Sequence, residues 1–594
     1  MIFLHNLGLV LRASTEFEDA ILAELETPVA LWYSKDEEKN RDQDPIEVVT
    51  VTEPSPNTAD VEPSGTSDES DPEPSTARLV LVLFGLWVLG SNSHGYQLGV
   101  LLSALDSTML ATIIEDICDD FDAFSSYSWV ATTYPIGLSI SQPFSGQLTN
   151  LLGRRYGLVL CLSVLAVGQL LCGLAPTLSV FLLGRIVQGL GAGCIGTITA
   201  FVETDLVSMR KRALIEGIGN ITYGVTLALG GVYGGGVSNA IGWKWAFRIQ
   251  VPFIVLDIAM VAFYLNIPQG KSRPIRRPVD YIGMVALLVI IILFQFGMNA
   301  AGSVFSWDSA AVLSTLILAG VGFLGFILWE LYKAQNPHIP IRALMQRTVA
   351  ASQLSSFFSN FGNTSIMYYV PVYLEVLGHS PGQSGLRFIP LALCFALGSF
   401  AAGFFVKVTA KYYYINFPVQ VCSVLGAVML CTMTQSTPSW APFVYLGIYG
   451  AGSGGAYVTR LMGLLTSTDK QHLAVVQSCS FTVRNTGTTI GQTISATIFQ
   501  NLSVKAISSL FRNQPDLADR ISHNYSKLDL LSGLERETAI RIYLRAARGV
   551  FFLAMAVLVA AAVATFVMQN NELVDDPKEK EVKGEKEKEK NVAS

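Results

Sequence analysis

The amino-acid sequence predicts an all-α, polytopic membrane protein with fourteen transmembrane helices, and three observations support this fold class. Of the 594 residues, 51% are hydrophobic and only 14% are charged, whereas soluble domains are about 25% charged. Mean hydropathy is +0.43. Apolar runs of the ~20 residues that a helix needs to cross the hydrocarbon recur along the chain, and basic residues gather in alternate loops between them.

In chain order, the predicted spans cover residues 79–114, 127–149, 156–175, 177–203, 215–240, 245–266, 280–300, 310–332, 350–376, 384–408, 414–434, 441–465, 479–502 and 547–568. Polar residues 91–97 interrupt the first of these runs. Three interpretations stay open: the helix is broken there, the span begins near Leu98, or an error in the gene model adds residues.

Both ends of the chain are polar. Residues 1–77 are largely acidic and rich in Pro, Ser and Thr, a composition typical of disorder, and residues 571–594 form a charged tail in which Lys and Glu alternate. The basic loops follow the even-numbered spans, so the positive-inside rule predicts that both termini lie in the cytoplasm.

An internal repeat predicts two six-helix halves, residues 78–266 and 348–570, separated by a two-helix insert with its flanking loops at 267–347. A glycine precedes a cation by eight positions after span 2 (Gly146 to Arg154) and again after span 10 (Gly403 to Lys411). Spans 4 and 12 each carry a Gly-x-Gly-x-Gly motif. Two such halves with a substrate site between them are typical of a rocking transporter. We expect residues 503–546 to form a non-cytoplasmic loop.

Two ionisable residues inside apolar spans are candidates for proton coupling. Asp106 lies in the first span and Arg185 in the fourth. A charge at such depth costs about 2.5–3.5 kcal/mol on insertion scales, so it indicates function by default. Protonation of Asp106 would release Arg185 and drive a conformational change. The structural alternatives are a carboxylate wetted near the helix end and an arginine that snorkels.

Three further groups of residues are candidates for function. A tight turn from Gly146 to Arg155, with nearby charges, predicts a conformational latch, although positive-inside anchoring alone would explain its arginines. Glycines in span 5 predict close helix packing. Polar and aromatic residues inside spans predict a substrate path. For Arg484, a structural role is the alternative to a place in this path. The latch residues are Gly146, Gly153, Arg154, Arg155, Asp205 and Arg212; the packing residues are Gly230, Gly231, Gly234 and Gly235; the path residues are Gln188, Tyr369, Tyr373, Glu375, Arg484 and Asn485.

Composition also argues against several classes of function. The net charge of −6 gives no case for nucleic-acid binding. The 8 cysteines and 6 histidines are dispersed without a CxxC motif, so we expect neither a metal site nor a disulfide framework. No nucleophile–base arrangement suggests an enzyme, and we expect no cofactor.

At its motifs the chain resembles the major facilitator superfamily, specifically the fourteen-span drug:proton antiporters, over residues 79–568. Three segments resemble family motifs: the residues around Asp106, the loop 146–155 and the stretch 185–191. The resemblance implies the major facilitator fold and identifies Asp106 and Arg185 as the proton-coupling pair. The sequence departs from the family pattern in two places, because Asn150 replaces a loop aspartate and Gly231 replaces the proline of the antiporter motif.

Within that family, residues 242–252, 411–416 and 481–491 are most similar to fungal vacuolar basic amino acid transporters. The resemblance implies a transporter that exports small organic solutes from the cytosol in exchange for protons, with basic amino acids entering the vacuole as the first expectation. Multidrug efflux at the plasma membrane is the alternative, and a non-transporting nutrient sensor is the alternative of another class. The expected partners are a small-molecule substrate, protons and the lipid bilayer, and we expect a monomer.

Overall fold

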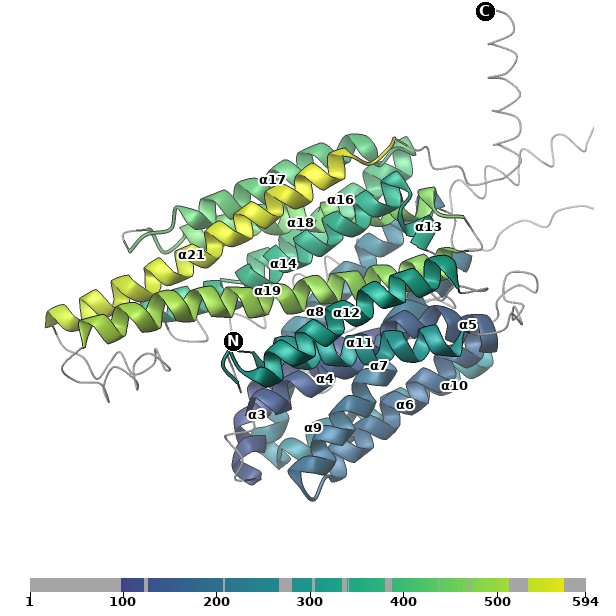
Figure 1. Cartoon of the computed structure of the whole chain (residues 1–594), viewed down its shortest axis with the longest axis horizontal. Helices are drawn as coiled ribbons and strands as arrows, with labels where there is room; N and C mark the ends of the chain where they lie inside the picture. Colours follow the sequence, from purple (N-terminus) through teal and green to yellow (C-terminus); the bar gives the residue numbers. More distant parts are fainter. Residues whose placement is uncertain are drawn as a thin grey trace, which may run out of the picture. The chain divides into compact units, whose positions relative to one another are not determined.

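The computed structural model describes residues 98–121, 127–206, 209–265, 280–301, 305–333, 339, 341–379, 387–435, 437–469, 472–511 and 533–570. The predicted tails at 1–77 and 571–594 and the interruption at 91–97 lie outside these residues. Within them the chain is almost entirely helical, and the helices run side by side in one general direction (Figure 1). This arrangement confirms the predicted all-α membrane fold class.

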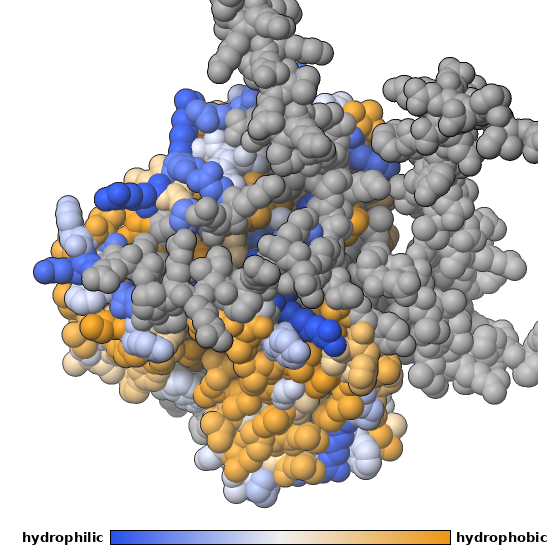
Figure 2. All heavy atoms as spheres, turned by 90° about the vertical axis from the view of Figure 1, so that its right-hand side faces the viewer, coloured by the Kyte–Doolittle hydropathy of each residue, from blue (hydrophilic) through white to orange (hydrophobic). Residues whose placement is uncertain are grey.

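Eight helices in the described residues are long and apolar enough to cross a membrane. The other predicted spans also carry helices, but these are more polar or shorter, so the count of fourteen stays a prediction. Large apolar side chains are widely exposed, for example Phe263 at 80% and Val232 at 72%. Hydrophobic residues cover much of the surface visible in Figure 2. Such a surface is suited to lipid rather than to water.

The helices before residue 266 form what we call the first helix group. They are α3 (Leu98–Asp120), α4 (Tyr127–Ser141), α5 (Ser145–Leu152), α6 (Arg154–Leu174), α7 (Leu178–Leu206), α8 (Met209–Ile241), α9 (Trp243–Arg248) and α10 (Gln250–Tyr264). Helix α7 packs on α4 and α6, α3 packs on α8, and α10 packs on α6. Small residues permit these approaches: a Cβ on Gly191 would lie 2.6 Å from the backbone N of Leu165.

The second helix group follows residue 340. It comprises α13 (Ile341–Leu344), α14 (Arg347–Val376), α16 (Ile389–Thr409), α17 (Tyr413–Cys431), α18 (Ala441–Ser467), α19 (Leu473–Leu510) and α21 (Gly533–Phe566). Its packing repeats that of the first group in chain order, because α18 packs on α16 and α17, α14 packs on α19, and α21 packs on α17. The two groups meet where α16 contacts α8 and where α19 contacts α5 and α7.

Between these groups in the sequence stand α11 (Tyr281–Ala300) and α12 (Ala310–Tyr332), which pack on each other. Asp280 caps α11 by accepting a hydrogen bond from the Gly283 backbone N–H at 3.0 Å, and it also accepts one from Trp329 Nε1 of α12 at 2.7 Å. Helix α11 contacts α4 of the first group and α19 of the second (Figure 1). The inserted pair therefore touches both groups.

Helix extends into two segments that the hydropathy pattern places between spans. The predicted turn from Gly146 to Arg155 is mostly helical, because α5 runs to Leu152 and only Gly153, with φ of +81°, breaks the chain before α6. The predicted loop 503–546 is helical up to Leu510 and again from Gly533. Polar residues lower the hydropathy of this segment, so the pattern did not predict a helix. Glu537 and Arg541 nevertheless form an i,i+4 ion pair that favours one.

Candidate functional site

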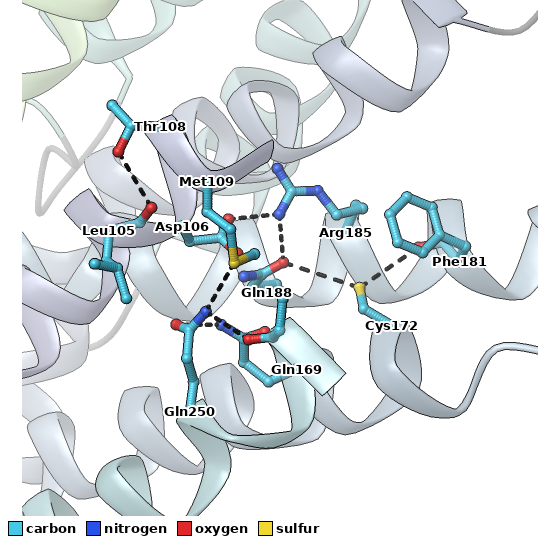
Figure 3. Close-up of polar contacts among 11 residues, drawn as sticks. Leu105, Asp106, Thr108, Met109, Gln169, Cys172, Phe181, Arg185, Gln188 and Gln250 are labelled. Carbon is cyan, nitrogen blue, oxygen red and sulfur yellow. Dashed lines mark hydrogen bonds and ion pairs between the residues drawn. The ribbon is translucent and has the colours of Figure 1, made fainter. Parts of the chain in front are cut away.

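Asp106 and Arg185 form a buried ion pair. The Arg185 Nη1 donates to the Asp106 Oδ2 at 2.5 Å (Figure 3), and both side chains are almost fully buried, at 1% exposed for Arg185 and 0% for Asp106. The two residues are 79 positions apart and come from α3 and α7. The structure thus brings together the two residues predicted to couple proton movement, at a depth where neither charge meets solvent.

The Arg185 guanidinium has two further partners. Its Nη1 also donates to Gln188 Oε1 at 2.8 Å, one turn along α7, and the guanidinium lies over the Tyr134 ring at 4.6 Å from the centroid. Asp106 has fewer partners, since its Oδ1 has no hydrogen bond among the described residues. If Asp106 became neutral, Arg185 would keep an amide oxygen and an aromatic face as partners.

A polar network continues from the ion pair toward α10 (Figure 3). Gln250 Nε2 donates to the Ala246 carbonyl at 3.1 Å and contacts Met109 Sδ at 3.4 Å, one turn from Asp106 on α3. Gln169 Nε2 of α6 donates to Gln250 Oε1 at 3.0 Å. Two buried polar groups therefore lie close together, one around the ion pair of α3 and α7 and one formed by Gln169 and Gln250, and Met109 of α3 contacts the second group.

The packing glycines of α8 fall into two pairs. A Cβ on Gly230 would lie 2.7 Å from the Leu105 carbonyl oxygen, and one on Gly234 would lie 2.8 Å from that of Met109, so both glycines allow α3 to approach α8. A Cβ on Gly231 would make only an ordinary contact with Thr112, and one on Gly235 would have nothing within 4 Å. The packing role predicted for Gly235 was wrong, because it lies on a different face of α8 from the two close glycines.

The predicted latch residues pair with acids at the ends of α6, α7 and α8. Arg154 Nε contacts Asp205 Oδ2 at 3.1 Å, and its Nη1 donates to Thr149 Oγ1 at 2.6 Å. Arg212 is buried and pairs with Glu203 and, at 3.3 Å, with Glu216. Arg155 is half-buried and makes no ion pair within the described part of the chain.

Gly146 lies where the two helix groups meet. A Cβ built on it would lie 3.2 Å from Val475 Cα and 3.1 Å from Ser478 Oγ of α19. The absence of a side chain at Gly146 therefore permits α5 to pack directly against the second group, as a latch between the groups would require.

The predicted substrate-path residues do not form one site. Asn485 Nδ2 donates to Gln142 Oε1 across the two groups at 2.7 Å, and Arg484 lies next to it, whereas Gln188 belongs to the Asp106 cluster. Tyr369 packs on Phe499, and Tyr373 packs on Phe551 of α21. Glu375, half-buried near the end of α14, is not brought together with Arg484 either. Aromatic residues in a span are equally suited to a core, and the sequence pattern could not separate these roles.

Several buried charges were not among the predicted site residues, and Asp257 and Arg460 are two of them. Asp257 of α10 is 1% exposed and accepts a hydrogen bond from the Gly99 backbone N–H of α3. Arg460 of α18 is 5% exposed. Each stands alone in an apolar run, and this is the signal that identified Asp106 and Arg185. Among the described residues, no three His, Cys, Asp or Glu side chains are grouped as metal ligands.

Comparison with known proteins places the fold in a family. The chain is 27% identical to the vacuolar membrane amino acid uptake transporter fnx2 of Schizosaccharomyces pombe, over 80% of this chain and 83% of that protein. It is also 27% identical to the multidrug resistance protein fnx1 of the same yeast (77% and 85%) and 28% identical to the efflux pump dotC of Dothistroma septosporum (72% and 74%).

Solved structures agree with this at the level of the fold. The human organic anion transporter TETRAN matches with a TM-score of 0.50 at 15% identity, over 78% of this chain and 98% of that one. A double-tryptophan mutant of XylE matches with a TM-score of 0.52 at 12% identity, over 83% and 98%. The family model described as Major Facilitator Superfamily matches residues 98–492. This chain therefore belongs to the Major Facilitator Superfamily and is a multi-pass membrane transporter rather than an enzyme.

Proposed function

We propose that the chain is a proton-coupled transporter that moves basic amino acids from the cytosol into the vacuole, working as a monomer with both termini in the cytosol. The observation that carries the coupling is the buried pair of Asp106 and Arg185 at 2.5 Å. A charge pair without solvent is stable only while both partners are charged, so proton binding to Asp106 weakens it.

The coupling step follows from the partners of the pair. With Asp106 ionised, α3 and α7 are held together by the ion pair. A proton on Asp106 cancels that attraction, and Arg185 then retains only Gln188 and the Tyr134 ring, both outside α3. Helix α3 thereby loses its charged link to α7, and the two helices can shift relative to each other. Proton release on the other side of the membrane restores the link.

The substrate and the membrane are inferred from the relatives. One protein similar over most of both chains is named a vacuolar membrane amino acid uptake transporter. The resemblance of residues 242–252, 411–416 and 481–491 to vacuolar basic amino acid transporters supports the same substrate class. The second candidate is efflux of drugs or toxins, because fnx1 and dotC are similar at nearly equal identity. The buried ion pair supports transport over a sensor, which would not need it.

The test is uptake of radiolabelled lysine, arginine and histidine into proteoliposomes under an imposed pH gradient, comparing the wild type with Asp106→Asn. We expect gradient-dependent uptake by the wild type and a loss of at least tenfold in the variant, because an amide cannot release a proton. Asp119→Asn, an exposed position on the same helix, is the matched control and should retain wild-type uptake.

Each other outcome changes the proposal in a defined way. Uptake by Asp106→Asn at the wild-type rate, still dependent on the gradient, would remove Asp106 from the coupling step. A folded wild type that takes up none of the three amino acids but transports lipophilic cations would favour the efflux function instead.

A further inference from the structure

A small cavity lies between the two helix groups, and its lining is rich in arginine. It has a volume of about 30 Å³, room for about one water molecule. Its lining residues come from α7, α8, α14, α18 and α19. The charged ones are Arg212, Glu216, Arg460 and Arg484. Three cations and one acid line this small cavity.

Arg212 has carboxylate partners that neutralise its charge. It pairs with Glu203 and with Glu216, the latter at 3.3 Å. These two carboxylates carry one negative charge more than Arg212 balances, so together with the two further arginines of the lining the group keeps a net charge of about +1. No ion pair in the described part of the chain joins either of them to a carboxylate.

Arg460 is the first of these cations. Its side chain is 95% removed from solvent, and its Nη1 has no hydrogen-bond partner among the described residues. Its backbone carbonyl accepts a hydrogen bond from Ser352 Oγ at 2.9 Å, which fixes this part of α18 against α14. A buried guanidinium nitrogen without a partner is costly, and an anionic ligand would offset that cost.

Arg484 is the second cation. Its guanidinium lies over the Phe481 ring at 4.1 Å from the centroid and over the Tyr457 ring at 5.2 Å. Tyr457 also forms side-chain hydrogen bonds with Arg484 and with Glu216. The aromatic rings hold the arginine in place without neutralising it, and apart from the donor that Tyr457 engages, its N–H groups remain for an anionic group.

We propose that Arg460 and Arg484 form the subsite that binds the carboxylate of the transported solute, with Glu216 facing its ammonium group. This inference rests on the proposed function and deepens it. The planar, five-donor guanidinium matches a carboxylate in a bidentate manner, and two of them in a lining with a net positive charge favour an anion over a cationic group. The lining thus fits a zwitterionic amino acid rather than a lipophilic cation.

The location of the subsite fits a transport cycle. Its arginines come from the second helix group, whereas Glu216 and Arg212 come from α8 of the first group. At about 30 Å³ the cavity is too small for an amino acid. The two helix groups must therefore separate around the lining residues to admit one. The compensating carboxylate would then enter with the substrate.

The experiment measures binding to the purified full chain in lipid nanodiscs, with lysine and lysinamide as a matched pair. Lysinamide keeps the size and the ammonium groups but lacks the carboxylate charge. We expect lysine to bind at least tenfold more tightly than lysinamide. Equal affinity for the two would overturn the subsite while leaving amine transport intact.

Variants of Arg460 test whether this residue causes the preference for lysine over lysinamide. Arg460→Gln should bring the two affinities within about twofold of each other, and Arg460→Lys should retain part of the difference. Arg387→Gln, which alters a buried arginine outside the cavity that lies over the Phe443 ring, should leave the preference unchanged. Arg460→Gln should also raise the unfolding temperature of the ligand-free protein, because an uncompensated buried charge is removed. A lower unfolding temperature together with an unchanged preference would show that Arg460 is structural.

A second experiment tests the carboxylate subsite independently of the amino acid assignment. Acetate, benzoate and chloride are tested for protection against thermal unfolding of the wild type and Arg460→Gln. If lysine does not bind but acetate or benzoate protects only the wild type, the carboxylate subsite stands and the amino acid assignment fails. Equal protection by chloride would overturn the carboxylate assignment, and no protection by any of the three, in the absence of lysine binding, would overturn both.

Discussion

Asp257 places a second carboxylate inside the first helix group. It lies on α10, two turns from Gln250, and accepts a hydrogen bond from the Gly99 N–H near the start of α3. Its Oδ1 has no hydrogen-bond partner among the described residues. Space around Gly99 is tight, since a Cβ there would lie 2.7 Å from Leu162 Cδ2 and 3.0 Å from Asp257 Oδ2. One oxygen of Asp257 therefore has a structural function.

This arrangement predicts different outcomes for two substitutions of Asp257. Asp257→Asn retains a carbonyl oxygen for the Gly99 N–H, so we expect the unfolding temperature to stay within about 2 °C of wild type. Asp257→Ala removes that acceptor and should lower stability by about 1–3 kcal/mol, the cost of an unsatisfied buried donor. Thermal unfolding in nanodiscs measures both. A large loss of stability in the asparagine variant would mean that the negative charge itself is required.

At the residue scale, the sequence predicted charges better than it predicted contacts. Asp106 and Arg185 stood out because each interrupts an apolar run, and their opposite signs suggested a pair. Gln188 follows Arg185 by three positions, so helix periodicity alone places the two on one face of α7, whereas the contact with the Tyr134 ring depends on how α4 and α7 cross. The place of Tyr373 in a substrate path stays a prediction, because packing against Phe551 and lining a path leave the same aromatic signature in a sequence.

At the element scale, α8 presents two adjacent faces to different surroundings. Gly230 and Gly234 lie one turn apart and face α3, whereas Gly235 has open space around its Cβ position. The distinction matters because α3 carries Asp106, so the close approach of α8 restricts where that carboxylate can stand.

Paired substitutions on α8 test this reading. Gly234→Leu would drive a side chain into the Met109 carbonyl, which lies 2.8 Å from the Cβ position, and overpacking of this kind costs about 1–3 kcal/mol. We expect a lower unfolding temperature and loss of uptake. Gly235→Leu adds the same volume on the open face and should keep both near wild type. Similar losses in the two variants would contradict the face assignment.

Helix positions were largely predictable because the length of an apolar run reflects the thickness of the hydrocarbon. The predicted span 310–332 matches α12, and 156–175 matches α6 within two residues. Predictions failed where helices continue through polar residues. Hydropathy marks where a helix leaves the hydrocarbon, whereas helix ends depend on backbone capping and local side-chain pairs, as at Gly153 and at Glu537 with Arg541.

At the scale of the whole molecule, the two helix groups are joined at separate points. Asn220 Nδ2 of α8 donates to Ser399 Oγ of α16 at 3.2 Å, and Asn485 of α19 donates to Gln142. Helix α11 adds an indirect link, because Gln295 donates to Ser139 of α4 and accepts from Thr489 of α19. Single hydrogen bonds between neutral side chains in membranes contribute only about 0.6 kcal/mol each, so these links can break one by one during a transport cycle.

The contact of Gly146 with α19 offers a direct test of such movement. The Cβ position of Gly146 lies 3.1 Å from Ser478 Oγ, so we expect the sulfur atoms of cysteines at both positions to come within reach of a disulfide. Oxidation of the double variant Gly146→Cys with Ser478→Cys should cross-link α5 to α19 and hold this end of the molecule closed.

We expect the cross-link to reduce proteoliposome uptake at least tenfold and a reducing agent to restore it, because substrate can enter the arginine-lined cavity only when the two groups separate. Each single cysteine variant, treated with the same oxidant, controls for the native cysteines, including the buried Cys479 next to Ser478. The extent of cross-linking is measured by the fraction of thiols lost. Full cross-linking with undiminished uptake would mean that α5 and α19 stay together throughout the cycle, and that the cavity opens by movement of other helices.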